Sequence, residues 1–588
     1  MKRRIAVYSV IGLLALVLIG IGYFLYLSDF SGTVTATHHQ TKTDGNRSTF
    51  RDGVVYRYPG MVPMLEVSGT HYEMGLQYGV LLKSEILSAL ESYEKILMWQ
   101  AVKMGIPYKV LTAVARRKAG VMIKRLPKRF LEEMQGVADG SGISIDTIQT
   151  ISMFYDVGES MGCTSILMKG KDGTVLHGRN QDATSFGGEE IGKMTVLVKY
   201  RPKGYNTVTQ LDWPLFLGVE TGYNDKGLAY SEETLSVNQP NPDGFSIVYL
   251  ARLALEECDT IDCLYPLFDK HPVIGAYGTV WSDRDEGRGI VAELTSHGWS
   301  ARELKGSILW NFNHIYDETL KVYQTSRVNL SESNRSRERI AAAFPQKEIY
   351  SVDDTIGFLR GHLDEKGRDY RWFGSSSPIC NHSAQQMMVF HPQNDGVYLA
   401  LGHYYAAQQK VYHIHNDFSK IPELYKEALP LGSAVEEEAK IHNKLISRGE
   451  KVALYQDLAR RYPKDANAQF LAAVHSFRQK YLEGFSEFAE KAYVMNPAVE
   501  EYRLYAGLAA YFKKQFDKAV IRLEEIDISE LYPYQKVYRI TVLERIYRDD
   551  GSGKSQEYRN HLNRLLKEHN AQEYYQDRIV PLIDMLSQ

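Results

Sequence analysis

Between about residues 60 and 425, short stretches of alternating apolar and polar residues are interleaved with longer stretches of helical periodicity. Alternation predicts half-buried strands, and apolar residues at helical spacing predict amphipathic helices. The predicted strands are 165–169, 175–178, 194–200, 227–231, 279–282, 289–294, 308–311 and 397–401. The predicted helices are 72–98, 129–141 and 247–268. Polar turns join many of these strands as hairpins, so we expect residues 59–425 to form an α+β domain whose helices cover antiparallel sheets.

After about residue 430 the strand pattern stops, and residues 430–588 are predicted to form an all-α domain. Residues 472–485 align with residues 506–519 at an offset of 34. Small and aromatic residues that recur at this period allow helical hairpins to stack closely, and the segment resembles the tetratricopeptide repeat. A generic helical bundle is the alternative. The matched pairs are Ala472 and Ala506, Phe477 and Tyr511, Leu482 and Phe516, and Glu483 and Asp517.

The first 30 residues carry a basic start followed by an uncharged apolar segment. Residues 5–27 contain no charge and, at about 1.5 Å rise per residue, are long enough for a helix to span a hydrocarbon core of about 30 Å. Lys2, Arg3 and Arg4 precede this segment and predict a cytoplasmic N-terminus. We therefore expect a single-pass protein of the cytoplasmic membrane, with residues 28–58 as a tether and an extracytoplasmic catalytic domain. A cleaved signal peptide is the alternative.

Charge and composition exclude several classes of function. Lys and Arg total 69 against 72 Asp and Glu, and this near balance argues against a nucleic-acid partner. The four cysteines do not form a disulfide framework or a zinc-ribbon pattern, and Cys258 and Cys263 are interpreted as core residues. His413 and His415 share one strand face and could be two metal ligands, but the sequence shows no third. No phosphate-binding or dinucleotide motif is present, so we expect no cofactor and no metal.

Cys163 is the cysteine whose surroundings indicate chemistry. It lies between small residues in Gly162-Cys163-Thr164-Ser165, and Arg179 and Asp182 follow it by 16 and 19 residues. A hairpin of this length returns its far end to the side of the cysteine. A guanidinium near a thiol lowers the thiol pKa, and a carboxylate can hold an α-amine in place. A surface salt bridge between Arg179 and Asp182 is the alternative interpretation of that pair.

These motifs resemble the acyl-coenzyme A:6-aminopenicillanate acyltransferase (isopenicillin N acyltransferase) family of the N-terminal-nucleophile (Ntn) hydrolase superfamily. The Gly-Cys-Thr followed by Gly178-Arg179-Asn180-Gln181-Asp182 is similar to the family's central signature, with the spacing that choloylglycine hydrolases use. The likeness covers about residues 60–420. Four further segments agree with the family in order: 69–79, 133–140, 222–229 and 311–314.

The resemblance implies a four-layer αββα fold and a precursor that cleaves itself between Gly162 and Cys163. Cys163 Sγ would attack the Gly162 carbonyl, and cleavage would free the Cys163 α-amine. Because an α-amine has a reference pKa of about 8, it can act as a general base for its own thiol near neutral pH. A substrate would then form a thioester on Cys163, which water or an amine discharges.

The resemblance assigns weaker roles to further residues. Arg179 and Asp182 would orient the nucleophile and the amine. Asn313 would donate an N–H to the oxyanion, with a turn at the strand end as the alternative. Thr234 lies where choloylglycine hydrolases place an asparagine, which puts an oxyanion role for it in doubt. Arg337 could match the superfamily's distal arginine, but Arg335 and Arg339 compete with it, and a solvated helix face is the favoured interpretation of that cluster.

The leading hypothesis is a membrane-anchored, self-processing amidohydrolase or N-acyltransferase that uses Cys163. Its substrate would be a small acyl or amide compound, with acyl-coenzyme A or a peptide as candidates. One alternative is an amidase closer to choloylglycine hydrolase. The other is a non-catalytic envelope protein that binds protein partners through its helical repeats.

Overall fold

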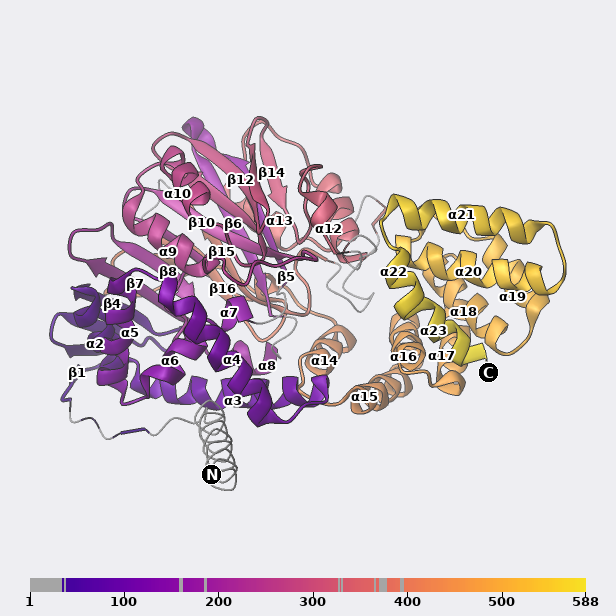
Figure 1. Ribbon diagram of the computed structural model, residues 1–588, viewed down its shortest axis with the longest axis horizontal. Helices are drawn as coiled ribbons and strands as arrows, with labels where there is room; N and C mark the ends of the chain where they lie inside the picture. Colours follow the sequence, from indigo (N-terminus) through magenta and orange to yellow (C-terminus); the bar gives the residue numbers. More distant parts are fainter. Residues whose placement is uncertain are drawn as a thin grey trace, which may run out of the picture.

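Two β-sheets lie at the centre of the larger part of the molecule, and helices make up the rest (Figure 1). The computed structural model describes residues 34, 35, 37, 39–157, 162–183, 188–325, 328, 332–363, 366, 367, 369, 378–391 and 396–587. Among these residues the last strand ends at Lys426, and helices follow it. The predicted α+β organisation, with a helical C-terminal region, is confirmed.

The first sheet has eleven strands, and most neighbours in it are antiparallel. Among its described strands only β4 and β7 pair in parallel, with Met64 opposite Leu197. In sheet order the strands are β1 (Lys42–Asp44), β2 (Arg47–Phe50), β3 (Gly53–Tyr56), β4 (Met64–Gly69), β7 (Val196–Pro202), β8 (Val208–Asp212), β9 (Thr221–Asn224), β10 (Leu228–Leu235), β11 (Ala276–Asp283), β12 (Arg288–Thr295) and β13 (Gly298–Glu303).

The second sheet has seven antiparallel strands and carries the Cys163 hairpin. In sheet order they are β14 (Ile308–Asn311), β5 (Gly162–Lys169), β6 (Val175–Asp182), β15 (Ala384–Phe390), β16 (Gly396–Leu401), β17 (Val411–His415) and β18 (Glu423–Lys426). Strand β5 is therefore flanked by β14 and β6, which places the start of the hairpin inside the sheet.

Helices cover the outer face of each sheet, which gives four layers. On the first sheet lie α2 (His71–Leu81), α3 (Lys83–Met104), α4 (Tyr108–Met122), α5 (Lys128–Ser141), α6 (Ile145–Ser152), α7 (Phe154–Val157), α8 (Gly188–Ile191), α9 (Ile247–Glu257) and α10 (Leu264–Lys270). On the second lie α12 (Glu332–Ala343) and α13 (Val352–Leu359). Between the sheets, Leu197 and Tyr223 of the first pack with Phe390 and Leu399 of the second.

Helices α2 and α5 cross at unusually short distance because glycines line the contact. A Cβ added at Gly75 would lie 2.0 Å from the Glu133 carbonyl oxygen, and one at Gly136 would lie 2.2 Å from the Tyr72 carbonyl oxygen. Gly79 and Gly140 continue the same contact one turn later. Two of the sequence segments that carried the family resemblance are therefore a single structural feature, a helix crossing that only glycine permits.

The C-terminal helices form a second body of paired helices, drawn in orange and yellow in Figure 1. They are α14 (Ser433–His442), α15 (Arg448–Arg461), α16 (Ala466–Arg478), α17 (Leu482–Met495), α18 (Glu500–Phe512), α19 (Phe516–Glu524), α20 (Pro533–Asp549), α21 (Lys554–Glu568), α22 (Gln572–Tyr574) and α23 (Val580–Ser587). The 34-residue offset relates the α16–α17 pair to the α18–α19 pair, and Ala472 and Ala506 are both buried between helices. The assignment to tetratricopeptide repeats stays a prediction.

Two predicted helices are interrupted. The helix expected over 72–98 breaks at Leu82, which separates α2 from α3. The helix expected over 247–268 ends at Glu257, and Cys258 forms a disulfide with Cys263 across the break. The interpretation of these two cysteines as plain core residues was therefore wrong, because a spacing of five residues places them side by side once the helix stops.

The expected membrane anchor and the single-pass location in the cytoplasmic membrane need correction. In the part of the chain that the structure describes, no helix is both long enough and apolar enough to cross a membrane. The residues predicted to form the anchor, 5–27, lie outside the described residues. The fold of the described residues therefore contains no transmembrane element.

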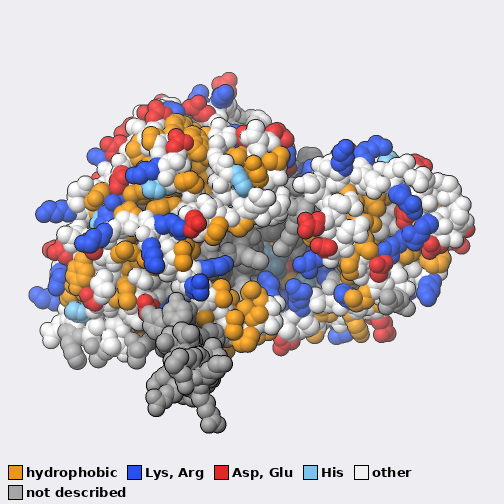
Figure 2. Space-filling view, in the orientation of Figure 1, with side chains coloured by type: hydrophobic (Ala, Val, Ile, Leu, Met, Phe, Trp, Pro, Cys, Tyr) orange, Lys and Arg blue, Asp and Glu red, His pale blue; other side chains and the backbone are white. Residues whose placement is uncertain are grey.

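Charged side chains of both signs lie on the face of the molecule that Figure 2 shows. Figure 2 shows acidic and basic groups interspersed on one face of the molecule, without a large region of one sign. The distribution on this face agrees with the near balance of charge in the sequence, with a net charge of −3.

The glycine crossing generates a prediction about stability. Gly75→Ala should lower the free energy of unfolding by about 2 kcal/mol or more, because the added methyl meets backbone atoms that cannot move aside. Gly120→Ala is the matched control, since Gly120 lies within α4 and a Cβ there would meet nothing within 4 Å. Denaturant unfolding of both variants tests this, and equal stability of the two would contradict it.

Candidate functional site

The hairpin of β5 and β6 brings the predicted nucleophile and its partners together. The register places Gly162 opposite Asp182, Cys163 opposite Gln181 and Ser165 opposite Arg179. The turn between the strands contains Asp172 and Gly173, both with positive φ. The juxtaposition expected from the spacing of 16 and 19 residues is therefore present, because the two strands have equal length and pair without a bulge.

Arg179 is the centre of the hydrogen-bond network at Cys163. Its Nη2 donates to Cys163 Sγ over 3.2 Å and to the Glu232 carbonyl oxygen over 2.7 Å. Its Nη1 donates to the Glu220 carbonyl oxygen over 2.8 Å and also contacts the Thr221 hydroxyl. Only 2% of Arg179 is exposed, so the alternative of a surface salt bridge was wrong. Its partners come from the opposite sheet, which the sequence did not indicate.

The Cys163 thiol is fully buried in the continuous chain. Burial raises its pKa to about 12, although the Arg179 guanidinium and the Asp182 backbone N–H act in the opposite direction. The negative charges of Asp182 and Glu233 add to the increase. The thiol therefore carries its proton at neutral pH, and a nearby base is needed before it can attack a carbonyl.

Asp182 lies at the end of β6 with no exposed surface. Its Oδ2 accepts a 2.6 Å hydrogen bond from Asn381 Nδ2, and its Oδ1 has no hydrogen-bond partner among the described residues. Burial raises its pKa to about 7, and the nearby Arg337 guanidinium limits that increase. A carboxylate with this pKa can accept and return a proton near neutral pH.

Asn313 contacts the Cys163 nitrogen in this structure. Its Oδ1 accepts a 3.0 Å hydrogen bond from Cys163 N–H, and its Nδ2 donates to the Thr234 carbonyl oxygen over 3.0 Å. One of the two N–H groups of the Asn313 amide is therefore used by the Thr234 carbonyl, and the oxyanion role expected for Asn313 stays a prediction. Thr234 contacts the site through its main chain.

Arg337 is the largest departure from the sequence analysis. Only 2% of it is exposed, and its Nη1 donates to the Cys163 carbonyl oxygen and, over 3.1 Å, to the Thr164 hydroxyl. Its Nη2 donates to Asn313 Oδ1 over 2.8 Å. The favoured interpretation of a solvated helix face was therefore wrong for Arg337, although it holds for the exposed Arg335. One turn of α12 presents one arginine inward and the other to solvent.

Sequence reasoning missed several buried polar residues around the site. Asn311 Nδ2 donates to Glu233 Oε2 over 2.7 Å, and burial raises the pKa of Glu233 to about 7. Glu220 accepts from the Gln181 amide, and burial raises its pKa to about 8. A signal was present for Glu233, since two adjacent glutamates lie in a strand that begins and ends with leucine. No local signal marked Glu220.

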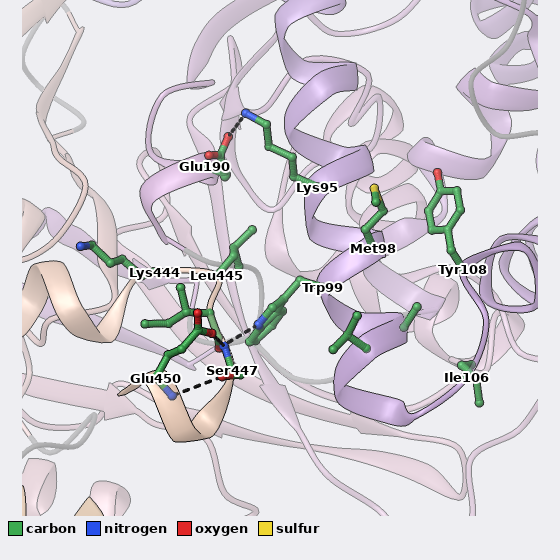
Figure 3. Close-up of a pocket in the computed structure, with 13 residues that line it drawn as sticks. Lys95, Met98, Trp99, Ile106, Tyr108, Glu190, Lys444, Leu445, Ser447 and Glu450 are labelled. Atoms are coloured by element: carbon green, nitrogen blue, oxygen red, sulfur yellow. Dashed lines mark hydrogen bonds and ion pairs between the residues drawn. The ribbon is translucent and has the colours of Figure 1, made fainter. Parts of the chain in front are cut away.

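Two further features lie away from Cys163. A pocket of about 780 Å³ opens between α3 and the connection from α14 to α15, and Trp99 Nε1 donates there to the Ile446 carbonyl oxygen over 3.3 Å (Figure 3). No predicted site residue lines this pocket. Glu423 of β18 lies opposite His413, so His413, His415 and Glu423 place donor atoms within 4.8 Å of one another. The third possible ligand came from a neighbouring strand that the sequence did not identify.

Comparison with known protein families matches part of the chain. Residues 168–372 match the family model described as acyl-coenzyme A:6-aminopenicillanic acid acyl-transferase. The matched range begins just after Cys163 and contains Arg179, Asp182, Asn313 and Arg337. The predicted family resemblance is confirmed over these residues.

Similar individual proteins cover parts of the chain. Protein dcd1A of Dictyostelium discoideum is 29% identical over 208 residues, which are 30% of this chain and 46% of that protein. Acid ceramidase of Mus musculus is 30% identical over 149 residues, 23% of this chain and 37% of that protein. The solved structure of penicillin V acylase from Agrobacterium tumefaciens is 14% identical, with a TM-score of 0.29, and covers 46% of this chain and all of that one. The chain spans less than half the length of these two curated relatives.

The buried position of Arg337 generates a prediction about the site. Arg337→Gln should slow any reaction at Cys163 by about tenfold or more, because charged hydrogen bonds to the Cys163 carbonyl and to Asn313 are lost. Arg335→Gln removes a solvent-facing charge from the same helix turn and should leave the rate unchanged. The appearance of chain fragments over time, measured on denaturing gels, distinguishes the two variants. Equal rates would show that Arg337 only supports the fold.

Proposed function

We propose that this protein is a self-processing amide hydrolase or acyltransferase that works through a thioester on Cys163. The observation that carries the proposal is the arrangement at this residue. Its thiol accepts from Arg179, its nitrogen donates to Asn313, and its strand pairs with the strand that ends at Asp182. A buried core cysteine requires none of these contacts.

The first step is cleavage of the chain. Cys163 Sγ attacks the Gly162 carbonyl carbon, the Gly162–Cys163 C–N bond breaks, and the nitrogen takes up a proton as the thioester forms. Asp182 is the base assigned to the thiol, because its Oδ1 is buried without a partner among the described residues and its pKa is about 7. Water then hydrolyses the thioester, which leaves a carboxylate on Gly162 and returns the thiol.

The second step uses the new N-terminus. The freed Cys163 amine stays within reach of Asn313 Oδ1 and becomes the base for its own thiol. The thiolate attacks the acyl carbon of an amide substrate, the C–N bond breaks, and the leaving amine takes the proton. Water or a second amine then attacks the thioester and releases the acyl group.

Intact-mass measurement and N-terminal sequencing of purified protein test the cleavage step. We expect two fragments, the second of which begins at Cys163. A homogeneous uncleaved chain of 67.0 kDa would contradict the proposal and favour a non-catalytic protein that binds partners through its helices.

A cysteine exchange tests the nucleophile directly. Cys163→Ala should remain uncleaved and inactive, because no sulfur is left to form the thioester. Cys163→Ser should be cleaved slowly, since a hydroxyl makes the same shift less readily. Cys380→Ala provides the control, since Cys380 is the other free, buried cysteine and should be dispensable for cleavage. Normal cleavage of Cys163→Ala would exclude the assignment.

The pKa of Asp182 predicts how cleavage depends on pH. The reaction needs the ionised carboxylate, and burial raises the pKa of this group to about 7. The fraction ionised therefore falls as the pH drops below 7, and the cleavage rate should fall with it. Rates measured on freshly refolded protein between about pH 5 and 9 test this. In Asp182→Asn this acidic limb should vanish together with most of the rate, and a rate that is flat across the range in the wild type would remove Asp182 from the mechanism.

A further inference from the structure

The loop that precedes β15 connects Asp182 to the helical body. Asn381 Nδ2 donates to Asp182 Oδ2 over 2.6 Å, and Ser383 N–H donates to Asn381 Oδ1 over 2.7 Å. The Ala183 N–H donates to the Ser383 carbonyl oxygen over 2.9 Å. All of these residues are buried. This loop therefore fixes the direction of the Asp182 carboxylate.

The opposite side of the same loop is held by α14. His382 Nδ1 lies 3.1 Å from both carboxylate oxygens of Glu438. Asn443, at the end of α14, donates from Nδ2 to the His382 carbonyl oxygen over 2.6 Å. The His442 ring stacks on the His382 ring, with centroids 3.5 Å apart and planes at 19°. Three residues from one helix end thus hold His382, the neighbour of Asn381.

We propose that α14 positions Asp182 for catalysis, with Glu438 and Asn443 as positioning residues that act through His382 and Asn381. This inference rests on the proposed function, in which Asp182 handles the proton of Cys163. It goes beyond that function because it gives α14, the first helix of the C-terminal body, a role in positioning Asp182.

Burial of Glu438 indicates that the contact does more than attach one body to the other. The side chain is 1% exposed, and a carboxylate taken out of water costs several kcal/mol unless it is paired. Its partners are His382 and the Tyr455 hydroxyl, which donates over 3.0 Å. Attachment alone is served by Val435 and Ala439, which pack into the core of the second sheet. The buried Glu438 carboxyl group therefore orients the His382 ring, in addition to joining the two bodies.

A metal ion is the competing explanation for this cluster. His382, Glu438 and His442 place donor atoms within 4.8 Å of one another. However, an imidazole binds a metal along its own plane, and two rings stacked at 19° direct their lone pairs along nearly parallel planes. His382 Nδ1 is also hydrogen-bonded to the Glu438 carboxylate. The arrangement therefore fits a hydrogen-bonded contact better than a metal site. We call this contact, from Glu438 and Asn443 of α14 to His382, the latch.

The latch affects the ionisation of Asp182. The hydrogen bond from Asn381 lowers the pKa of this carboxyl group, against the larger effect of burial. If the loop shifts, that hydrogen bond is lost and the pKa rises. Several charged or titratable groups act on Asp182 or face the loop. They include Arg337 of α12, Arg179 of β6, Cys163 of β5, Cys380 and His382 of the loop, Arg360 after α13, Tyr405 after β16, and Glu438 and His442 of α14.

Neutralising Glu438 tests the latch. Glu438→Gln should slow cleavage at Cys163 by about tenfold and move the acidic limb of its pH profile to higher pH, because Asp182 loses a fixed donor. Glu437→Gln is the matched control, since the neighbouring Glu437 pairs with Arg461 and Tyr462 inside the helical body. It should lower stability slightly and leave the pH profile in place. If Glu438→Gln does not fold, Tyr455→Phe tests the same contact by a milder change. It should slow cleavage and shift the acidic limb by less than is expected for Glu438→Gln.

Hydrogen exchange provides a measurement that does not depend on activity. Amides of residues 380–384 should exchange faster in Glu438→Gln than in Glu437→Gln or wild type. If the wild type is never cleaved but this difference appears, the proposed function fails and the latch stands. Equal exchange, or an unmoved pH profile, would overturn the latch. A bound metal ion in the purified protein, with activity lost on chelation and restored by Zn²⁺, would overturn it in favour of a metal site.

Discussion

The structure depends on one buried cation, the guanidinium of Arg179. It extends from the seven-stranded sheet to the main-chain oxygens of Glu232 in the eleven-stranded sheet and of Glu220 just before β9, and its Nη2 also donates to the sulfur of Cys163. A buried charge is costly unless its donors are used, so the two sheets must approach at the spacing that satisfies it. The same contact that fixes the spacing of the layers therefore fixes the position of Cys163, the proposed nucleophile.

Around this cation, burial sets the protonation of the site. Burial raises the pKa of the Cys163 thiol to about 12, so in the continuous chain this thiol keeps its proton at neutral pH unless a base removes it. Asp182 and Glu233, each with a pKa near 7, supply groups that can exchange protons near neutral pH. Such a closed site is compatible with the intramolecular cleavage proposed above, because the Gly162 carbonyl belongs to the same chain and no substrate needs to enter. In the proposed function, cleavage then provides the amine that acts as the base for the thiol.

The helical body is more closely connected to the catalytic domain than a boundary near residue 430 suggests. Val435 and Ala439 of α14 are part of the core that covers the second sheet, and Tyr532 of the loop before α20 joins the same cluster. Trp99 of α3 bonds to the connection after α14, beside the pocket in Figure 3. The strands and the first helix of the C-terminal body thus form one structural unit, and the later helices extend from it.

The sequence by itself determined local helices and strands and placed the candidate site residues Cys163, Arg179 and Asp182 in one hairpin. Strand 308–311 was predicted to the residue. The proximity of Cys163 to Arg179 and Asp182 followed from the length of the hairpin, because a tight antiparallel pair is set by nearby residues alone. The helix break at Cys258 and the burial of Arg337 were not predicted. Helical spacing gives the same pattern for an arginine that faces water and for one that faces a buried carbonyl. Only the tertiary structure decided which face of α12 meets the site. It alone brought Glu220 to Arg179, Asn381 to Asp182 and Glu438 to His382. Contacts of this kind join segments that are distant along the chain, so they leave no local periodicity in the sequence.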